Sequence, residues 1–320
     1  MVQAMLAERP ALDTKKFQNP EVTAKGEARA AVALARLDTL WINTGSLCNI
    51  ECDGCYIESG PKNDRLAYIT RDEATAFLDE IARDGLGTRE IGFTGGEPFM
   101  NRDLPAMAED ALARGFRVLI LTNAMAPLWQ KRAAVAELAR RHGKALALRV
   151  SIDHFTPAGH EAVRGANSWA PMLRGLKWLA EAGVTLSVAA RQPAGETEDE
   201  TRAGFTGLFT AEGIALDARS PRDLVVFPDM DAASDVPEIT TDCWGILGVD
   251  PAGMMCATAR MVVKRKGDSA PVVLPCTLLP YDRRFEMGPT LASAGGPVHL
   301  NHPHCATFCV LGGANCSGGD

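Results

Sequence analysis

The chain has 320 residues, of which 46% are hydrophobic, and a formal net charge of −7 at pH 7. This length and apolar content can bury a full core, as one large domain or as a domain with a smaller appendage. The negative net charge disfavours a wide nucleic-acid interface. The sequence has no run of about 18 apolar residues, so we expect no membrane span. Residues Met1–Pro10 include Glu8 and Arg9 where a secretory signal needs an unbroken apolar stretch, so we expect a cytoplasmic protein.

Residues 1–38 are expected to form a helical lead-in to the main domain. Pro10 and Pro20 interrupt its first part. The Ala-rich segment that follows carries apolar residues at helical spacing, which predicts a helix over Glu27–Leu37 that packs on the main domain.

From residue 39 the chain alternates between β-like and helical patterns. The apolar β-like runs are Thr39–Thr44, Glu90–Thr94, Arg117–Thr122, Leu146–Ser151, Thr185–Ala190 and Asp223–Phe227. A capping-box pair, Thr70 and Glu73, starts the first helix between them. The later helices are predicted at Leu104–Arg114, Lys131–Arg141, Met172–Ala182 and Asp199–Ala211. Strands separated by helices imply parallel pairing, so residues 39–230 are predicted to fold as an α/β partial (β/α)6 barrel of the TIM type. Active groups in such barrels lie at the carboxyl ends of the strands.

The pattern changes after the acidic stretch Asp229–Asp242, and residues 236–320 are predicted to form a small cysteine-rich domain. Met261–Val263 and Val272–Leu274 flank a polar turn and predict a β-hairpin. Six of the nine cysteines lie in this last quarter of the chain, and in a reducing compartment they favour metal sites over disulfides.

Three further cysteines follow the first predicted strand closely. Cys48, Cys52 and Cys55 have the spacing C-x3-C-x2-C, so three thiolates of one loop can bind three irons of a [4Fe–4S] cluster. The fourth iron then lacks a protein ligand, and an open position is typical of catalytic metal centres. The amino and carboxylate groups of S-adenosylmethionine (SAM) can chelate that iron. The alternative is a zinc or structural cluster site, although zinc normally takes four protein ligands in paired spacing.

This loop resembles the signature of the radical SAM superfamily, and further segments resemble the family in the same order. Phe93 to Pro98 ends the second strand and is similar to the family's GGE motif, which holds the amino group of SAM. The resemblance therefore implies that Gly95, Gly96 and Glu97 contact the cofactor.

The resemblance extends to the ends of the next strands. Thr122-Asn123 resembles a TNG segment, with Ala124 in place of the glycine. The Ser-Ile-Asp segment resembles the ribose and carboxylate site, an Arg-Gly pair follows it, and a guanidinium at the end of strand five can pair with the SAM carboxylate. The cofactor-binding residues implied in these segments are Asn123, Ser151, Asp153, Arg164 and Arg191.

One position departs from the family pattern. Many relatives place an aromatic residue directly before the third cysteine, beside the adenine, whereas this chain has Gly54 there and Tyr56 after the cysteine. The backbone contact at Gly54 is expected to remain. Packing against the adenine is expected from elsewhere, for example from Val226 or Phe227.

The remaining cysteines resemble the ligands of a SPASM or twitch domain, which carries auxiliary iron–sulfur clusters. They are Cys243, Cys256, Cys276, Cys305, Cys309 and Cys316. Two fully ligated cubanes need four cysteines each, so six cysteines predict one complete auxiliary [4Fe–4S] cluster. The preferred ligands are Cys243, Cys256, Cys305 and Cys309, and Cys276 or Cys316 can replace one of them. The CxxC pair of a full SPASM domain is absent, which favours a twitch-like domain.

Three alternatives remain for these cysteines. They are two clusters completed by an open site or by a histidine such as His302 or His304, a zinc site, and buried free thiols.

The resemblance implies an oxidoreductase-type radical enzyme. A flavodoxin or ferredoxin would reduce the first cluster, SAM would be cleaved to methionine and a 5′-deoxyadenosyl radical, and the radical would take a hydrogen atom from the substrate. Only 38 residues precede the first predicted strand, whereas peptide-modifying relatives often carry a leader-binding domain there. We therefore expect a small-molecule metabolite, oxidised or rearranged in a biosynthetic pathway.

Other functions remain open. They are modification of a ribosomally made peptide by a thioether or C–C crosslink, a non-catalytic iron–sulfur scaffold or electron carrier, and methyl or methylthio transfer. The sequence assigns no catalytic acid or base.

Overall fold

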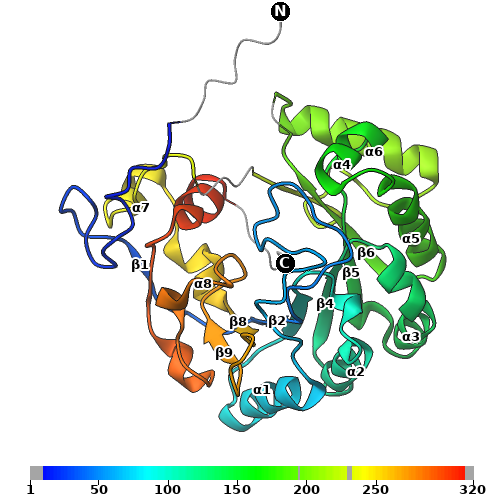
Figure 1. Cartoon of the computed structure of the whole chain (residues 1–320), viewed down its shortest axis with the longest axis horizontal. Coiled ribbons are helices and arrows are strands. Elements are labelled where there is room, and N and C mark those ends of the chain that lie inside the picture. The colour runs from blue at the N-terminus through cyan, green and yellow to red at the C-terminus, as the bar shows by residue number, and fades with distance from the viewer. Residues whose placement is uncertain (1–9, 194, 229–232, 314–320) are drawn as a thin grey trace, which may run out of the picture.

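The computed structural model describes residues 10–193, 195–228 and 233–313. Its centre is an eight-stranded sheet in the order β7-β6-β5-β4-β3-β2-β8-β9 (Figure 1). Six neighbouring strands pair in parallel, namely β2 (Thr39–Asn43), β3 (Glu90–Thr94), β4 (Arg117–Thr122), β5 (Leu146–Ser151), β6 (Thr185–Arg191) and β7 (Leu224–Phe227). They are the six predicted strands, with ends that differ by at most a residue. The predicted α/β class and parallel sheet are confirmed.

Helices connect these strands and lie along the outer side of the sheet (Figure 1). They are α1 (Arg71–Asp84), α2 (Leu104–Ala113), α3 (Ala126–His142), α4 (Pro157–Arg164), α5 (Trp169–Glu181) and α6 (Glu198–Glu212). The predicted capping box is present, since the Thr70 side chain accepts from the Glu73 amide and the Glu73 carboxylate accepts from the Thr70 amide. Helix α4 was not predicted, and it begins with Thr156 as N-cap and Pro157 in its first turn.

The two faces of the sheet belong to two different cores. On β2, Leu40 and Ile42 pack under the helices, while Trp41 packs on the inner face with Met261 of β8. This alternation follows from the two-residue period of a strand. The Trp41 ring fills the space beside β3, because a Cβ atom on Gly92 would lie 2.4 Å from that ring.

The C-terminal region extends the same sheet. Strand β8 (Ala259–Val263) pairs in parallel with β2, and β9 (Val272–Leu274) completes the predicted antiparallel hairpin with β8. The predicted units 39–230 and 236–320 thus share one sheet, and their division into domains stays a prediction. The shorter elements of this region are α7 (Cys243–Leu247), α8 (Met255–Thr258), β10 (Val298–His299) and a π-helical segment at Cys305–Leu311. Single 3-10 turns lie at Pro98–Met100, Gly143–Ala145, Pro251–Gly253, Arg283–Phe285 and Ala292–Gly295.

The predicted helix over Glu27–Leu37 is wrong. Instead, β1 (Ala31–Val32) pairs antiparallel with β10, and the Ala30 amide donates to the Ile239 carbonyl at 2.9 Å. The main-chain groups of this segment are therefore bonded to distant parts of the chain, which overrides the helix propensity of its alanines.

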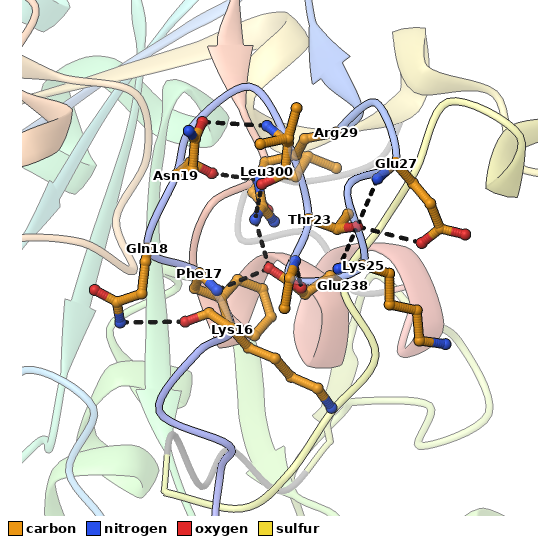
Figure 2. A network of polar contacts seen from close by, with 12 residues as sticks. Lys16, Phe17, Gln18, Asn19, Thr23, Lys25, Glu27, Arg29, Glu238 and Leu300 are labelled. Atoms are coloured by element: carbon orange, nitrogen blue, oxygen red, sulfur yellow. Dashed lines mark hydrogen bonds and ion pairs between the residues drawn. The ribbon is translucent and has the colours of Figure 1, made fainter.

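A buried ion pair fastens this N-terminal segment to the C-terminal region (Figure 2). Arg29 pairs with Glu238, and their side chains are 0% and 6% exposed. Arg29 also donates to the carbonyl oxygens of Asn19, Val22 and Leu300. Because both charges are neutralised and hydrogen-bonded, the pair can be buried without leaving an isolated ion.

Among the residues that the structure describes, no helix is both long enough and apolar enough to cross a bilayer.

Candidate active site

A cavity of about 170 Å³ lies at the carboxyl ends of the parallel strands. Its lining includes the cysteines of the C-x3-C-x2-C loop and most residues of the predicted motifs. These are Cys48, Cys52, Gly54, Cys55, Gly95, Gly96, Asn123, Ser151, Asp153, Arg164 and Arg191. Residues from the ends of β2 to β6 therefore meet in one place, as expected for a parallel barrel. Of the cluster-binding and cofactor-binding residues predicted for this site, Glu97 is not part of the lining, and neither is Val226, a suggested adenine contact.

The three cysteines of the loop are free thiols. Cys48 is 6% exposed, and burial raises its pKa to about 12. Burial also raises the pKa of Cys52, against the lowering effect of the Arg164 charge. Thiols held protonated in this way become thiolates when a metal centre supplies the missing positive charge. The donor set therefore fits a metal cluster.

The spacing of the thiols also bears on the kind of metal centre. Within the described ranges, no three His, Cys, Asp or Glu side chains gather around the position of a single metal ion. In a cubane cluster each thiolate binds a different iron, so its ligands stand further apart than those of one ion.

Gly95 and Gly96 allow the loop after β3 to lie directly against the cysteine loop. A Cβ atom on Gly96 would lie 2.1 Å from the Leu47 carbonyl oxygen, and one on Gly95 would lie 2.5 Å from the Gly45 oxygen. The Gly96 amide donates to the Gly45 carbonyl at 2.8 Å. Only glycine fits where two backbones approach this closely.

Glu97 is buried beneath these loops. Its carboxylate accepts hydrogen bonds from the Phe99 amide at 3.2 Å, the Thr122 hydroxyl at 2.9 Å and the Asn123 amide at 2.8 Å. Burial raises the pKa of Glu97 to about 7 in spite of these donors. The carboxylate thus joins the ends of β3 and β4, and its predicted contact with the SAM amino group stays a prediction.

The Asn123 side chain points toward the cysteine loop. Its Nδ2 lies 2.9 Å from Asn49 Oδ1 and 3.8 Å from Cys48 Sγ. Its Oδ1 accepts from the Met125 amide at 3.0 Å, which fixes the orientation of the side-chain amide. Ala124, which replaces the family glycine, keeps a left-handed backbone with φ of 58°.

Asp153 joins two of the predicted guanidiniums. Its carboxylate oxygens lie 2.6 Å from Arg164 Nε and 3.1 Å from Arg191 Nε. Burial acts to raise the pKa of Asp153, but the charges of Arg164 and Arg191 outweigh it and hold the pKa below its usual range. Arg191 Nη1 also donates to the Asp53 carbonyl at 2.9 Å and the Gly54 carbonyl at 3.3 Å. This carboxylate is therefore ionised, and Arg191 connects it to the cysteine loop.

Several lining residues, Arg149 among them, were not predicted from the sequence, whereas Phe227 was named there as a possible adenine contact. Arg149 lines the cavity because it stands two residues before Ser151 on β5 and so shares its face. Phe227 also lines the cavity, with its ring centroid 5.3 Å from that of Phe308, whereas Val226 packs against the outer core. Strand alternation is the signal that separates Phe227 from Val226.

A second, smaller cavity gathers four cysteines of the C-terminal region. Cys256, Cys276, Cys305 and Cys309 line it, and each is at most 9% exposed. Burial raises the pKa of Cys256 to about 11 and that of Cys305 to about 12. Four cysteines outside any disulfide around an otherwise mostly apolar cavity fit an iron–sulfur cluster with four cysteine ligands.

The set of cysteines that line this cavity differs at one position from the ligand set preferred from the sequence, which stays a prediction. Cys243 does not line this cavity, and the Thr240 amide donates to its Sγ at 3.4 Å. Cys276, which was predicted only as a possible replacement ligand, lines the cavity together with the other three. Cys316 lies outside the described residues. His304 lines the cavity, while His302 does not.

Comparison with curated proteins gives partial matches. The GTP 3′,8-cyclase of Tolumonas auensis is 30% identical over 149 residues, which cover 46% of this chain and 42% of that protein. The antilisterial bacteriocin subtilosin biosynthesis protein AlbA of Bacillus subtilis is 27% identical over 143 residues, covering 44% of this chain and 30% of AlbA. The chain thus spans less than half the length of these curated relatives.

Solved structures share the fold. Streptococcus suis SuiB bound to S-adenosylmethionine superposes with a TM-score of 0.58 and 13% identity, covering 79% of this chain and 63% of SuiB. Native anSMEcpe with bound AdoMet gives a TM-score of 0.55 and 13% identity, covering 80% of this chain and 79% of that one.

The family model of the Radical SAM superfamily matches residues 42–202, about half of the chain, and this range contains the three-cysteine loop and every motif residue around the larger cavity. The chain belongs to the radical SAM superfamily.

Proposed function

We propose that this protein is a radical SAM enzyme that abstracts a hydrogen atom from a small-molecule metabolite, for an oxidation or rearrangement in a biosynthetic pathway. The observation that carries the proposal is the single cavity lined by three free thiols and by motif residues of five successive strands. When bound, the [4Fe–4S] cluster and SAM used by this superfamily supply a 5′-deoxyadenosyl radical to such a cavity.

Cys48, Cys52 and Cys55 would hold the cluster. The Asn123 amide, 3.8 Å from Cys48 Sγ, would donate to that thiolate and stabilise it. The rigid contacts of Gly95 and Gly96 would keep the cysteine loop against the end of β3.

The ends of β5 and β6 would orient SAM. Ser151 offers a hydroxyl to the ribose, and Arg191 offers guanidinium donors to the methionine carboxylate. Asp153 and Arg164 would hold Arg191 in position through their shared ion pairs. Phe227 and Phe308 would exclude water from the reacting end of the cavity.

For the C-terminal region we propose one auxiliary [4Fe–4S] cluster in a twitch-like domain. Its ligands would be Cys256, Cys276, Cys305 and Cys309, which are supported by their common cavity. Such a cluster can take an electron from a substrate radical, which would make the net reaction an oxidation. A flavodoxin or ferredoxin is the proposed reductant of the first cluster.

Modification of a ribosomally made peptide is the second candidate. It is favoured by the likeness to AlbA, a bacteriocin biosynthesis protein, and to SuiB, whose fold has also been solved bound to the precursor peptide SuiA. Incubation with small peptides encoded beside the gene, followed by mass spectrometry of those peptides, separates the two candidates. The mass of an added peptide changes only if that peptide is the substrate.

Formation of 5′-deoxyadenosine tests the assignment of the first cluster. We predict that Cys52→Ala abolishes 5′-deoxyadenosine formation after reduction, because the cluster loses one of its three ligands. Cys243→Ala is the matched control, since this thiol lies outside both cysteine-lined cavities and its loss should leave the product intact. Product formation by the Cys52 variant at the wild-type rate would show the proposal to be wrong.

A further inference from the structure

Two buried arginines, Arg29 and Arg260, belong to the region around the four-cysteine cavity. Of these two, Arg29 has a carboxylate partner. Arg29 is 4% exposed and pairs with Glu238 (Figure 2). Arg260, on β8, is 1% exposed. A guanidinium is the side-chain cation that keeps its charge most readily when it is buried.

Arg260 donates to main-chain carbonyls alone. Its Nη1 lies 2.6 Å from the Cys256 oxygen and 2.8 Å from the Ala259 oxygen. Its Nε lies 2.8 Å from the Ala294 oxygen, and its Nη2 lies 3.3 Å from the Gly296 oxygen. Among the residues that the structure describes, no carboxylate lies within ion-pair distance of Arg260. Carbonyl dipoles satisfy its N–H groups but carry no net charge, so within the described part of the chain the buried cation lacks a counter-ion.

The Arg260 guanidinium is hydrogen-bonded to the main chain of a residue whose thiol lines the cavity, through the 2.6 Å contact between Nη1 and the Cys256 oxygen. Arg29, in contrast, already has Glu238 as its partner. A cubane cluster with four thiolate ligands carries a net negative charge, which is the partner that Arg260 lacks.

We propose that Arg260 is the counter-ion of the auxiliary cluster bound by Cys256, Cys276, Cys305 and Cys309, and that its charge raises the reduction potential of that cluster. The inference rests on the proposed auxiliary cluster. Reduction adds a negative charge to the cluster, so a fixed cation beside it favours the reduced form. Arg260 would thereby help the cluster to accept an electron, and its role is electrostatic because its side chain is not part of the cavity lining.

Gly296 provides a test that leaves Arg260 in place. This residue is exposed, has an ordinary φ of −66°, and has nothing within 4 Å of an added Cβ atom. Its carbonyl accepts from Arg260 at 3.3 Å, so Gly296→Asp adds a negative charge to a residue that already contacts the guanidinium through its main chain. Gly296→Asn is the matched neutral control.

The measurement is an EPR-monitored redox titration of the full chain carrying Cys48→Ala, Cys52→Ala and Cys55→Ala, so that only the auxiliary cluster contributes. We expect Gly296→Asp to disfavour reduction about tenfold, equal to a potential lower by about 59 mV for one electron, and Gly296→Asn to leave it unchanged. Arg260→Gln should lower the potential in the same direction, and Arg260→Lys, which keeps the charge, should lower it less.

Two results overturn the inference in distinguishable ways. If the Gly296→Asp and Gly296→Asn variants have equal reduction potentials and bind about four irons per chain, Arg260 is not the counter-ion, although the auxiliary cluster is present. Failure of the triple-cysteine background to bind any iron after anaerobic reconstitution would remove the auxiliary cluster and the counter-ion with it.

Discussion

His160 on α4 is fully buried, and both of its ring nitrogens lack a hydrogen-bond partner among the residues that the structure describes. Its ring packs edge-on against Trp169, with the centroids 5.5 Å apart. Burial and the Arg164 charge lower the pKa of His160 to about 4. The imidazole therefore packs as a neutral aromatic ring, and its polar atoms are left unsatisfied at a cost in stability.

Replacing this ring with a purely apolar one should stabilise the protein. We predict that His160→Phe raises the free energy of unfolding by about 1–3 kcal/mol at pH 7, because it keeps the contact with Trp169 and removes two unsatisfied nitrogens. Chemical denaturation of the apoprotein measures this. A variant less stable than wild type at pH 7 would show that the nitrogens have partners and that this account of His160 is wrong.

The same variant should also lose an acid-sensitive component of stability. The folded-state pKa of His160, about 4, lies below the ordinary value of 6.5, so the unfolded chain takes up a proton first as the pH falls. Through His160 alone, the free energy of unfolding is therefore unaffected above pH 6.5 and declines between pH 6.5 and 4, by about 1.4 kcal/mol for each pH unit. Subtracting the His160→Phe curve from the wild-type curve isolates this term.

At the level of elements, the glycine loop after β3 and the cysteine loop after β2 act as one unit. The Gly96 amide bonds to the Gly45 carbonyl and the Glu97 amide to the Leu47 carbonyl, at 2.8 and 3.1 Å. Two further backbone hydrogen bonds hold the cysteine loop, from the Cys48 amide to the Gly60 carbonyl at 3.1 Å and from the Asp53 amide to the Val163 carbonyl at 2.8 Å.

Adding one methyl group at Gly96 should disrupt the contact between the glycine loop and the cysteine loop. We predict that Gly96→Ala lowers the free energy of unfolding by about 1–3 kcal/mol, since its Cβ would overlap the Leu47 backbone, and that the variant retains less iron after reconstitution. The control is Gly207→Ala in α6, an exposed helical position with open space, where the same change should stabilise by about 0.5–1 kcal/mol. Wild-type iron retention by Gly96→Ala would mean that the loop contact does not hold the cluster ligands.

The strands and most helices could be predicted because their signals are local. Each parallel strand is a short apolar run, and the Thr70–Glu73 capping box marks the first turn of α1 in the sequence. Strand β1 could not be predicted, since Ala31–Val32 are extended only because β10, far along the chain, pairs with them. The attachment of β8 to β2 likewise depends on a long-range pairing.

The site residues divide in the same way. The motif loops were identified because spacing along one loop fixes which thiols lie together, as for Cys48 and Cys52. The four cysteines that line the smaller cavity come from separate segments, so the sequence could count the candidate thiols but could not choose Cys276 over Cys243 as the fourth. Arg260 belongs to no sequence motif. That its described partners are main-chain carbonyls and not carboxylates can be seen only in the folded chain.

At the scale of the whole molecule, the N-terminal segment, the barrel strands and the C-terminal region form one continuous structure. Arg29 and Glu238 connect the first and last of these, and β8 connects the last to the barrel sheet (Figures 1 and 2). The two cysteine-lined cavities share Leu278 in their linings, so they are adjacent within this structure. Adjacent clusters would permit electron transfer between the substrate cavity and the auxiliary site.

The central claim is that the cluster on Cys48, Cys52 and Cys55 leaves one iron open to SAM. The most direct measurement is the EPR spectrum of the anaerobically reconstituted and reduced protein, recorded with and without SAM. We predict that SAM changes the spectrum of the wild-type protein and leaves that of Cys52→Ala unaltered. A wild-type spectrum that is identical with and without SAM, or zinc in place of iron on these three thiols, would contradict the account.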